Sequence, residues 1–434
     1  FVMDINGFGV ENYRSYDQLD CVSLFYKESG LPLSFWHSCH LKNTYNVYST
    51  RLAHANFAKF YFDYFIEQQI DIEDRIESLA LLTKQECEDF IGACLFRVDK
   101  EKQNLSNNVA SFAQFRDKGL DNLIHATTYS QSKVSALYAR NRIKSFSAFV
   151  QYIYKQVHAF SINRVPEDMK ERYQDFLVML KEAAKGIKDD NAIVKDPFEQ
   201  AIPTDNYFRL LEISKPSHDA NPWSPSSRLR NHIITQIFNQ TGIRVGALCK
   251  LKISDLRTDV RARIVITRTP NDPTDSRKRP ATQKTKAHVS AISAELMTSI
   301  RLYIETERAK YPISNDHDFI LVSHKGETAG QPLAKQSVND LFEPLSKAVD
   351  FHIYPHLLRH KWNEIFEDAA KAAGLSPEHI NDLRKYACGW AEDSKMVAIY
   401  NEFKNALAVA EISMSAQEKI VPKVEKLNIT KDKA

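Results

Sequence analysis

Hydrophobic residues recur at different spacings along the chain, and the changes in spacing divide it into segments. Residues 1–45 mix short aromatic and β-branched runs, such as Cys21 to Tyr26, with glycine and proline breaks. Runs of this kind are typical of strands, so we expect a small strand-containing N-terminal extension. The pattern alone indicates no role for this extension.

Residues 46–185 follow a helical pattern. Five aromatic residues fall on one face of a candidate helix, namely Phe57, Phe60, Tyr61, Tyr64 and Phe65. Further helices are expected at 79–96 and 134–157, so the segment is predicted to be a helical bundle. A charged stretch with few apolar residues, 186–198, interrupts the pattern and indicates an interdomain linker.

Residues 199–415 are predicted to form a second domain that is mainly helical with one small sheet. Strands are expected at 262–267 and 287–292. Helices are expected at 205–214, 226–240, 244–248, 294–310, 336–349, 356–373, 377–386 and 394–408. The basic end of the chain, 416–434, has the composition of a disordered tail. The predicted fold class is therefore mainly α with a small β-sheet in the second domain.

Composition and charge narrow the class of protein. The chain has 434 residues, a length too great for one compact domain, and 43% of them are hydrophobic. The formal net charge is only +3, so a polyanionic partner would have to be recognised by local clusters of cations. Six cysteines without a CxxC pair indicate reduced thiols. We find no apolar run of roughly 18 to 20 residues and no secretory pattern, so we expect a cytoplasmic protein.

The first segment that could carry chemistry runs from Thr241 to Leu251. Gly242 permits a sharp turn between two helices, which lets Arg244 project from a helix start into a cleft. An arginine there can place two N–H donors on the oxygens of one phosphate, which a lysine cannot do. On its own, an arginine after a glycine is more often an ordinary surface residue.

The second segment is Tyr354-Pro-His-Leu-Leu-Arg-His. His356, Arg359 and His360 lie three and four residues apart, so they share one face of a helix that begins after Pro355. Such a face beside the positive end of a helix suits an anion. The alternatives are a His-rich surface helix or a metal site, but a zinc site needs further ligands and none is obvious nearby. We predict no metal.

The third segment runs from Tyr386 to Tyr400 and contains the pair Gly389-Trp390. Together the three segments resemble the tyrosine recombinase family, also called the phage integrase family. The family pattern is an Arg in a T-G-[LI]-R segment, an H-x-x-R-H helix, a G-[HW] pair and a Tyr shortly afterwards. The resemblance covers roughly residues 200 to 410. Each motif is weak alone, but their common order and spacing make the resemblance specific.

The resemblance implies a role for each matching residue. Arg244 and Arg359 would hold the scissile phosphate and neutralise the charge that builds on its oxygens. His356 would assist proton transfer near the nucleophile, and His360 would support it. Trp390 can donate one N–H bond but cannot act as a base, so its role would be positional.

Tyr400 is the nucleophile that the resemblance implies. A phenol that attacks phosphorus forms a new phosphodiester, which conserves the energy of the broken strand. The reaction then needs no ATP, no metal and no other cofactor. A free phenol has a pKa of about 10, and a cationic pocket would help to form the phenolate.

The family also uses a lysine in a β-hairpin turn to protonate the leaving 5′ oxygen. In this chain the loop between the two expected strands is basic. Lys284, followed by Thr285, is the residue that best fits the family's K-T form, and Lys286 is the alternative because the hairpin register is open. Other cations of this loop would contact DNA phosphates, namely Arg277, Lys278 and Arg279.

Another basic cluster lies in the first domain, on the helix expected at 134–157. Its candidate DNA contacts are Lys133, Arg140, Arg142 and Lys144. A solvated basic face is the alternative. The chain departs from the family pattern at Ala247, where most members have a glutamate, and Tyr400 follows Trp390 by one residue more than in many members.

The resemblance implies a C-shaped clamp of two domains closing around double-stranded DNA, with the N-terminal extension added. A helical segment, 403–414, resembles the element that docks onto a neighbouring protomer, which implies a homotetramer on two DNA sites. Accessory DNA-bending proteins and a place in the bacterial cytoplasm, on the nucleoid when bound, follow in the same way. The alternatives are a type IB-like topoisomerase and a catalytically inactive DNA-binding relative.

Overall fold

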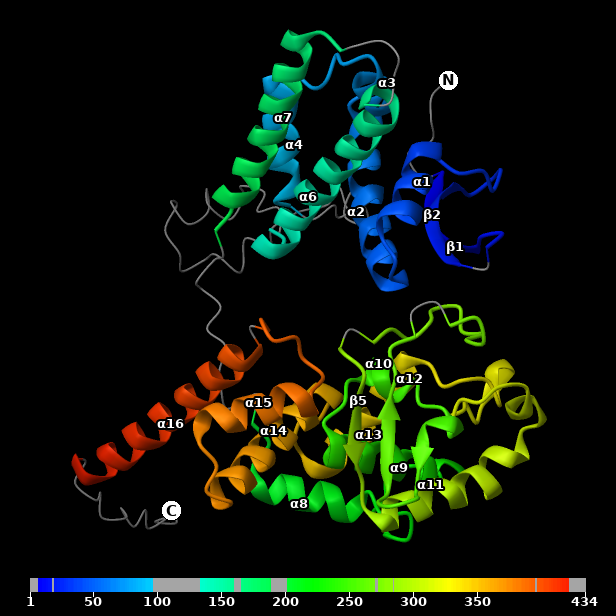
Figure 1. The fold of residues 1–434 in the computed structure, drawn as a ribbon, viewed down its shortest axis with the longest axis vertical. Helices are drawn as coiled ribbons and strands as arrows, with labels where there is room; N and C mark the ends of the chain where they lie inside the picture. The colour runs from blue at the N-terminus through cyan, green and yellow to red at the C-terminus, as the bar shows by residue number, and fades with distance from the viewer. Residues whose placement is uncertain are drawn as a thin grey trace, which may run out of the picture. The chain divides into compact units, whose positions relative to one another are not determined.

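The structure is a computed structural model that describes residues 7–17, 19–96, 133–159, 165–188, 201–269, 272–283, 285–394 and 396–420. The chain divides into two compact units, Phe1–Val194 and Lys195–Ala434. Both are mainly helical, each with a small antiparallel sheet (Figure 1). The fold class predicted from the sequence is confirmed. Most of the expected linker and of the expected basic tail lies outside the described residues.

The first unit begins with an antiparallel hairpin of β1 (Phe8–Arg14) and β2 (Asp20–Tyr26). The hairpin packs on α1 (Phe35–Thr44) and α2 (Tyr48–Glu67). Phe8 and Leu24 lie in the same apolar core as the helices that follow. The strands therefore brace the helical part of this unit.

The other described residues of the first unit are mainly helical. They are α3 (Ile72–Glu77), α4 (Lys84–Cys94), α6 (Ala136–Tyr154) with a short π-helical turn after it (Lys155–Ala159), and α7 (Glu167–Gly186). The helix expected at 79–96 begins later than predicted, because Leu79 and Leu81 adopt positive φ angles of 61° and 52°. Thr83 then starts α4 through a capping box with Glu86, which is a T-x-x-E signal.

The aromatic stripe predicted on α2 lines the core of this unit. Phe65 stacks on Phe90 with ring centroids 5.1 Å apart, and Phe90 lies 4.7 Å from Phe146. All three side chains are almost completely buried. Aromatic pairs at such distances add to the stabilisation from burial, so these rings hold α2, α4 and α6 together.

Two buried histidines make the stability of the first unit depend on pH. Burial lowers the pKa of His37 to about 3 and that of His40 to about 4. Both rings are neutral in the folded chain, so they stabilise it above their unfolded pKa of about 6.5, and this stabilisation is lost as the pH falls toward 4. We expect each ring to account for a loss of about 3 kcal/mol in the free energy of unfolding between pH 7 and pH 4.

Urea unfolding of the full chain at both pH values measures this loss. The variant His37→Leu removes one titrating ring from an environment formed by Tyr61, Phe62 and Phe149. It should lose less stability on acidification than the wild type. An equal loss in both proteins would contradict the assignment, because surface carboxylates titrate in both.

The second unit contains most of the helices predicted for it. They are α8 (Thr204–Ile213), α9 (Pro225–Thr241), α10 (Val245–Leu248), α11 (Ala294–Thr306), α12 (Lys335–Asp340), α13 (Phe342–Val349), α14 (Pro355–Ala372), α15 (Pro377–Ala387) and α16 (Met396–Ile420). Short 3-10 helices lie at Ile253–Asp255, Arg308–Lys310, Pro312–Asp316 and Gly326–Thr328. One helix was expected at 336–349, and two are present. Pro344 explains the break, because it lacks the N–H that a continuous helix needs there.

The sheet of the second unit has the order β3-β4-β5. The two expected strands are β4 (Arg263–Ile266) and β5 (His288–Ala291), paired antiparallel with Ile266 opposite His288. A short strand, β3 (Leu256–Arg257), adds to β4 and was not predicted.

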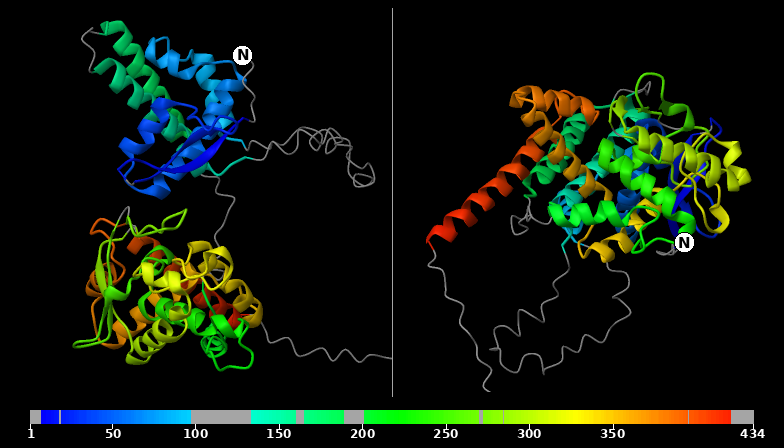
Figure 2. Two further views of the ribbon diagram at one scale, coloured as in Figure 1. Left: turned by 90° about the vertical axis from the view of Figure 1, so that its right-hand side faces the viewer. Right: turned by 90° about the horizontal axis from the view of Figure 1, so that it is seen from below.

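Helix α9 is the centre of the second core. Its apolar side chains Ile233, Ile234, Ile237 and Phe238 are fully buried, and the helix packs on α14 and α11. Because α9 ends at the first motif and α14 carries the second, this packing brings the two motifs together. Helix α16 extends away from the rest of the unit (Figures 1 and 2). Among the described residues, no helix is both long and apolar enough to cross a membrane.

Candidate active site

The turn after α9 places Arg244. Gly242 ends the helix in a left-handed conformation, with φ of 57°, which suits glycine. A Cβ atom at Gly242 would also lie 2.6 Å from the ring of Trp362 on α14, so only glycine fits. Arg244 follows as the residue that caps α10, in the extended conformation. The predicted sharp turn is therefore present, and it sets the first arginine beside α14.

Arg359 joins the three sequence motifs. The side chain rises from α14 and is only 2% exposed. One terminal nitrogen, Nη1, donates to the carbonyl oxygen of Gly242, and Nη2 donates to that of Cys388 at 3.5 Å. The guanidinium also lies 5.7 Å from the ring of Trp390. One guanidinium thus contacts the turn after α9 and the turn after α15.

His356 and His360 share one face of α14, as predicted, with their ring centroids 4.8 Å apart. His356 is exposed, yet its pKa lies below the ordinary value, because partial desolvation and the charges of Arg359 and Arg244 disfavour the imidazolium. Desolvation, His356 and Arg359 together lower the pKa of His360 to about 4. At neutral pH the two rings are therefore neutral and able to accept a proton.

The turn after α15 carries the Gly389-Trp390 pair. Gly389 has a positive φ of 61°, and a Cβ atom there would meet Lys286 and His288 at 2.7 Å. The backbone N–H of Lys286 donates to the carbonyl oxygen of Gly389 at 2.8 Å. Trp390 is 4% exposed and packs with Cys388, beside Trp362. This turn therefore joins the segment just before β5 to the arginine site.

His288 belongs to this site and was missed by the sequence analysis. It is the first residue of β5, is 8% exposed, and its Nδ1 lies 3.0 Å from the carbonyl oxygen of Lys286. Burial lowers its pKa, and the charges of Arg359 and Arg244 lower it further. The signal was the alternation of the strand, which points His288 and Ser290 toward the interior.

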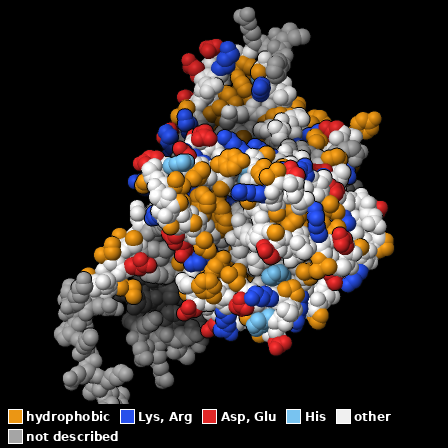
Figure 3. Space-filling model, turned by 60° about the horizontal axis from the view of Figure 1, so that its bottom comes forward, with side chains coloured by type: hydrophobic (Ala, Val, Ile, Leu, Met, Phe, Trp, Pro, Cys, Tyr) orange, Lys and Arg blue, Asp and Glu red, His pale blue; other side chains and the backbone are white. Residues whose placement is uncertain are grey.

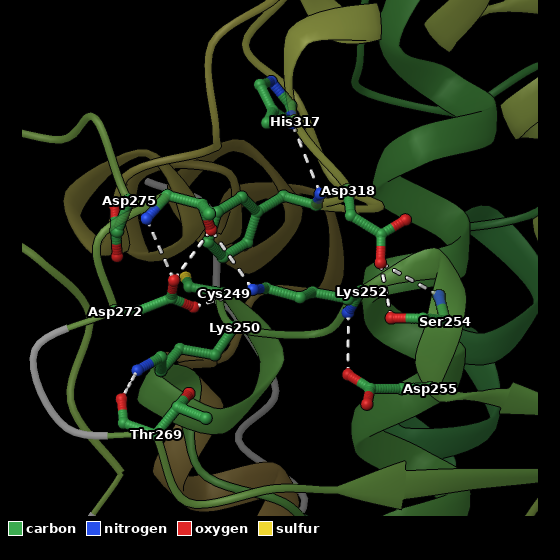
Figure 4. A network of polar contacts seen from close by, with 12 residues as sticks. Cys249, Lys250, Lys252, Ser254, Asp255, Thr269, Asp272, Asp275, His317 and Asp318 are labelled. Carbon is green, nitrogen blue, oxygen red and sulfur yellow. Dashed lines mark hydrogen bonds and ion pairs between the residues drawn. The ribbon is translucent and has the colours of Figure 1, made fainter.

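A buried network of charges anchors the loop that precedes β5 (Figure 4). Lys250 donates to the carbonyl oxygen of Thr269, and the ammonium of Lys252 lies 2.8 Å from the carboxylate of Asp272. Asp272 is 7% exposed and Lys250 5% exposed. These contacts fix the start of the loop to the segment that follows α10.

The predicted DNA contact Arg277 is wrong, because its side chain belongs to this buried network. It is 5% exposed and pairs with the carboxylate of Asp275 at 2.7 Å. It also donates to the carbonyl oxygens of Cys249 at 2.9 Å and Leu333 at 2.8 Å. Each of its three side-chain nitrogens donates to a protein acceptor, so Arg277 holds the loop in place.

The structure also contradicts the prediction that Arg142 contacts DNA. It is 6% exposed, donates to the carbonyl oxygens of Cys94 and Phe96, and lies over the ring of Phe60 at 3.8 Å. Arg140 is half-buried and donates to the carbonyl oxygen of Ile187 at 3.2 Å. These arginines connect helices of the first unit.

The remaining predicted cations differ in exposure. The exposed ones are Lys133, Lys144, Lys278, Arg279 and Lys286. Lys286 is 57% exposed, and its ammonium lies 3.8 Å from Glu392. On the face drawn in Figure 3, lysines and arginines are interspersed with acidic side chains. That face has no uniform positive charge, which agrees with the small net charge of the chain.

For two of the predicted residues the structure describes no side chain. Lys284 lies outside the described residues. Tyr400 lies on α16, but its side chain is outside what the structure describes. Within the described part of the chain, no group of three His, Cys, Asp or Glu residues is placed to hold a metal ion.

Comparison with known proteins identifies the domain that contains this site. Residues 201–364 match the family model described as the phage integrase family. For residues 201–364 this match bears out the family resemblance predicted from the motifs. No curated protein matches the chain in sequence.

Solved structures similar to this chain include three recombinases. The XerA recombinase has 16% identity and a TM-score of 0.34, with 90% of this chain and 100% of that chain covered. The XerH recombinase in a post-cleavage complex has 16% identity and a TM-score of 0.39, covering 79% and 97%. A lambda integrase tetramer on a Holliday junction has 13% identity and a TM-score of 0.34, covering 88% and 96%.

Proposed function

We propose that the chain is a site-specific DNA recombinase of a mobile element, which cuts and rejoins strands through a 3′-phosphotyrosine intermediate. The observation that carries this proposal is the position of Arg359, whose guanidinium contacts both the Gly242 turn and the Cys388 turn. These contacts bring together the turn before Arg244, the helix that carries His356 and His360, and the turn that precedes α16. Such a set suits phosphoryl transfer without a metal.

In this mechanism the phenol oxygen of Tyr400 attacks the scissile phosphorus, and the bond from phosphorus to the 5′ oxygen breaks. The phenolic proton passes to a neutral base, for which His356 is placed on the exposed face of α14. Arg244 and Arg359 neutralise the charge on the non-bridging oxygens. A lysine of the β4–β5 loop gives the 5′ oxygen its proton. Reversal of these steps by the 5′ hydroxyl of a new strand completes the exchange.

The same reasoning assigns the partners. Double-stranded DNA is the substrate. The exposed cations Lys278, Arg279 and Lys286 of the β4–β5 loop, with Lys133 and Lys144 on the first unit, contact its phosphates. Helix α16 exposes Val409 and Ile412, which lie three residues apart on one face and are 63% and 69% exposed. An apolar helix face of this kind favours docking onto a second copy, so we assign the active form as a homotetramer on two sites.

Covalent capture tests the proposal. The full chain is first used to select a binding site from a pool of random duplexes, and a nicked suicide duplex is built on that site. We expect a DNA adduct of the chain that forms through a tyrosine and leaves a free 5′ hydroxyl. Binding without any adduct would favour a catalytically inactive relative. Site-independent relaxation of supercoiled DNA would favour a type IB-like topoisomerase.

The lysine that protonates the leaving group can be identified with a sulfur-substituted substrate. We expect Lys284→Ala to slow cleavage of ordinary DNA by about a hundredfold or more, as loss of a general acid typically does. Replacing the 5′ bridging oxygen with sulfur should largely restore the rate, because a thiolate leaves without a proton. Lys286→Ala is the matched control. Rescue of Lys286→Ala alone would transfer the role to Lys286.

A further inference from the structure

His288 lies against the Gly389 turn of the arginine site although it belongs to none of the sequence motifs. Its ring covers Gly389, where a Cβ atom would meet Nδ1 at 2.7 Å and Cε1 at 3.0 Å. The preceding residue, Cys388, accepts from Arg359 through its carbonyl oxygen. His288 is therefore separated from the Arg359 contact by one residue of backbone.

The hydrogen bond of His288 determines which nitrogen carries the proton. Nδ1 lies 3.0 Å from the carbonyl oxygen of Lys286, and a carbonyl oxygen can only accept. Nδ1 is therefore the protonated nitrogen of the neutral ring, and Nε2 carries a lone pair. Nε2 is buried and has no hydrogen-bond partner among the described residues. Burying a hydrogen-bond acceptor without a donor costs free energy of folding, so Nε2 is available to accept a hydrogen bond from a nearby N–H group.

Arg359 offers the complementary group. Its Nη1 and Nη2 donate to Gly242 and Cys388, while Nε is buried without an acceptor among the described residues. His288 and Arg359 contact adjacent residues of one turn, Gly389 and Cys388. A neutral imidazole acceptor and a guanidinium N–H donor, each without a partner among the described residues, therefore lie at the same turn.

We propose that His288 is a positioning residue for the strand-transfer reaction: its Nε2 accepts a hydrogen bond from Nε of Arg359 when DNA is bound. This bond fixes the plane of the guanidinium, so that the second N–H of each Nη faces the phosphate. Ala247, three positions after Arg244, is a small apolar residue where most family members have a glutamate, so it offers no side-chain hydrogen bond. The bond from His288 supplies orientation that Ala247 does not provide. The inference rests on the proposed recombinase function.

The test compares two suicide duplexes that differ at the scissile phosphate. One carries the ordinary phosphate, and the other carries a methylphosphonate, which lacks one anionic oxygen and so needs less from the arginines. We expect His288→Leu to cleave the ordinary duplex about tenfold more slowly than the wild type, as loss of one charge-assisted hydrogen bond implies. On the methylphosphonate duplex, His288→Leu should cleave at most about twofold more slowly than the wild type. Arg359→Lys should shift the ratio of the two rates in the same direction.

The ratio is measured within each variant, so a smaller folded fraction cannot change it. His288→Gln keeps an acceptor oxygen and should lie between the wild type and His288→Leu. Ser290→Ala is the control, because Ser290 is the next inward residue of β5, 9% exposed, and should leave both rates unchanged. An unchanged ratio in His288→Leu, with the wild type active, would overturn this inference alone. Absence of any adduct with the wild type would instead overturn the proposed function.

Discussion

Tyr400→Phe abolishes covalent attachment to a nicked suicide duplex and leaves DNA affinity nearly unchanged: this is the expected result with the largest effect. The substitution removes only the phenolic oxygen, which is the atom that forms the new bond to phosphorus. Without it no 3′-phosphotyrosine can form, so the adduct should fall below detection. The adduct is measured on a denaturing gel, and affinity is measured by a shift assay with the intact duplex.

Tyr386→Phe is the matched control for this experiment. Tyr386 is 65% exposed on α15, close in sequence to the Gly389 turn, and its loss removes the same single oxygen. We expect its adduct yield to equal that of the wild type. An undiminished adduct with Tyr400→Phe would disprove the assignment of the nucleophile, and mapping the adduct by mass spectrometry would show which tyrosine replaces it.

The second large effect concerns the arginine pair. We expect Arg244→Lys and Arg359→Lys each to slow cleavage of the bound duplex by roughly a hundredfold or more, the usual cost of removing one preorganised donor. A lysine keeps the charge, but its single nitrogen cannot make the parallel forked contact of a planar guanidinium. Arg359 is bonded to carbonyl oxygens on two turns, so a lysine there would also loosen the site. Single-turnover rates at saturating protein measure the effect.

The same assay in excess EDTA addresses the role of metals. If the arginines provide the positive charge that two-metal nucleases take from Mg²⁺, the wild type should keep its rate. Arg279→Lys is the control for the two arginine-to-lysine substitutions, because Arg279 is exposed and makes the same change of side chain outside the arginine pair. This variant should cleave at the wild-type rate. Cleavage that stops with EDTA and returns with Mg²⁺ or Zn²⁺ would overturn the mechanism.

The sequence predicted the helices that build the arginine site because their signals are local. Gly242 ends α9 and Pro355 begins α14, and both residues are typical of those positions. The break between α12 and α13 was missed although Pro344 marks it. The roles of Lys284 and Tyr400 stay predictions, since the structure does not describe their side chains.

The errors concern the burial of charged residues, which depends on partners distant in the chain. Arg142 shares the buried stripe of α6 with Ala139, Ile143 and Phe146, so its helical position already indicated an interior side chain. For Arg277 the buried acceptors at Cys249 and Leu333 lie far away in sequence, and no local pattern reveals them. For His288 the alternation of β5 indicated an interior side chain, but its neighbours at the Gly389 turn are distant in the chain, so its place in the site was missed.

The buried ion pair between Arg277 and Asp275 has a consequence for how the protein responds to salt. Mobile ions screen exposed charges over a Debye length of about 10 Å at 0.1 M, but they hardly reach a pair whose side chains are 5% and 0% exposed. Added salt should therefore weaken the attraction of the exposed cations to DNA while the anchored loop keeps its conformation. Under the proposed function, ionic strength is then expected to control how long the chain stays on DNA without changing the conformation of the anchored loop.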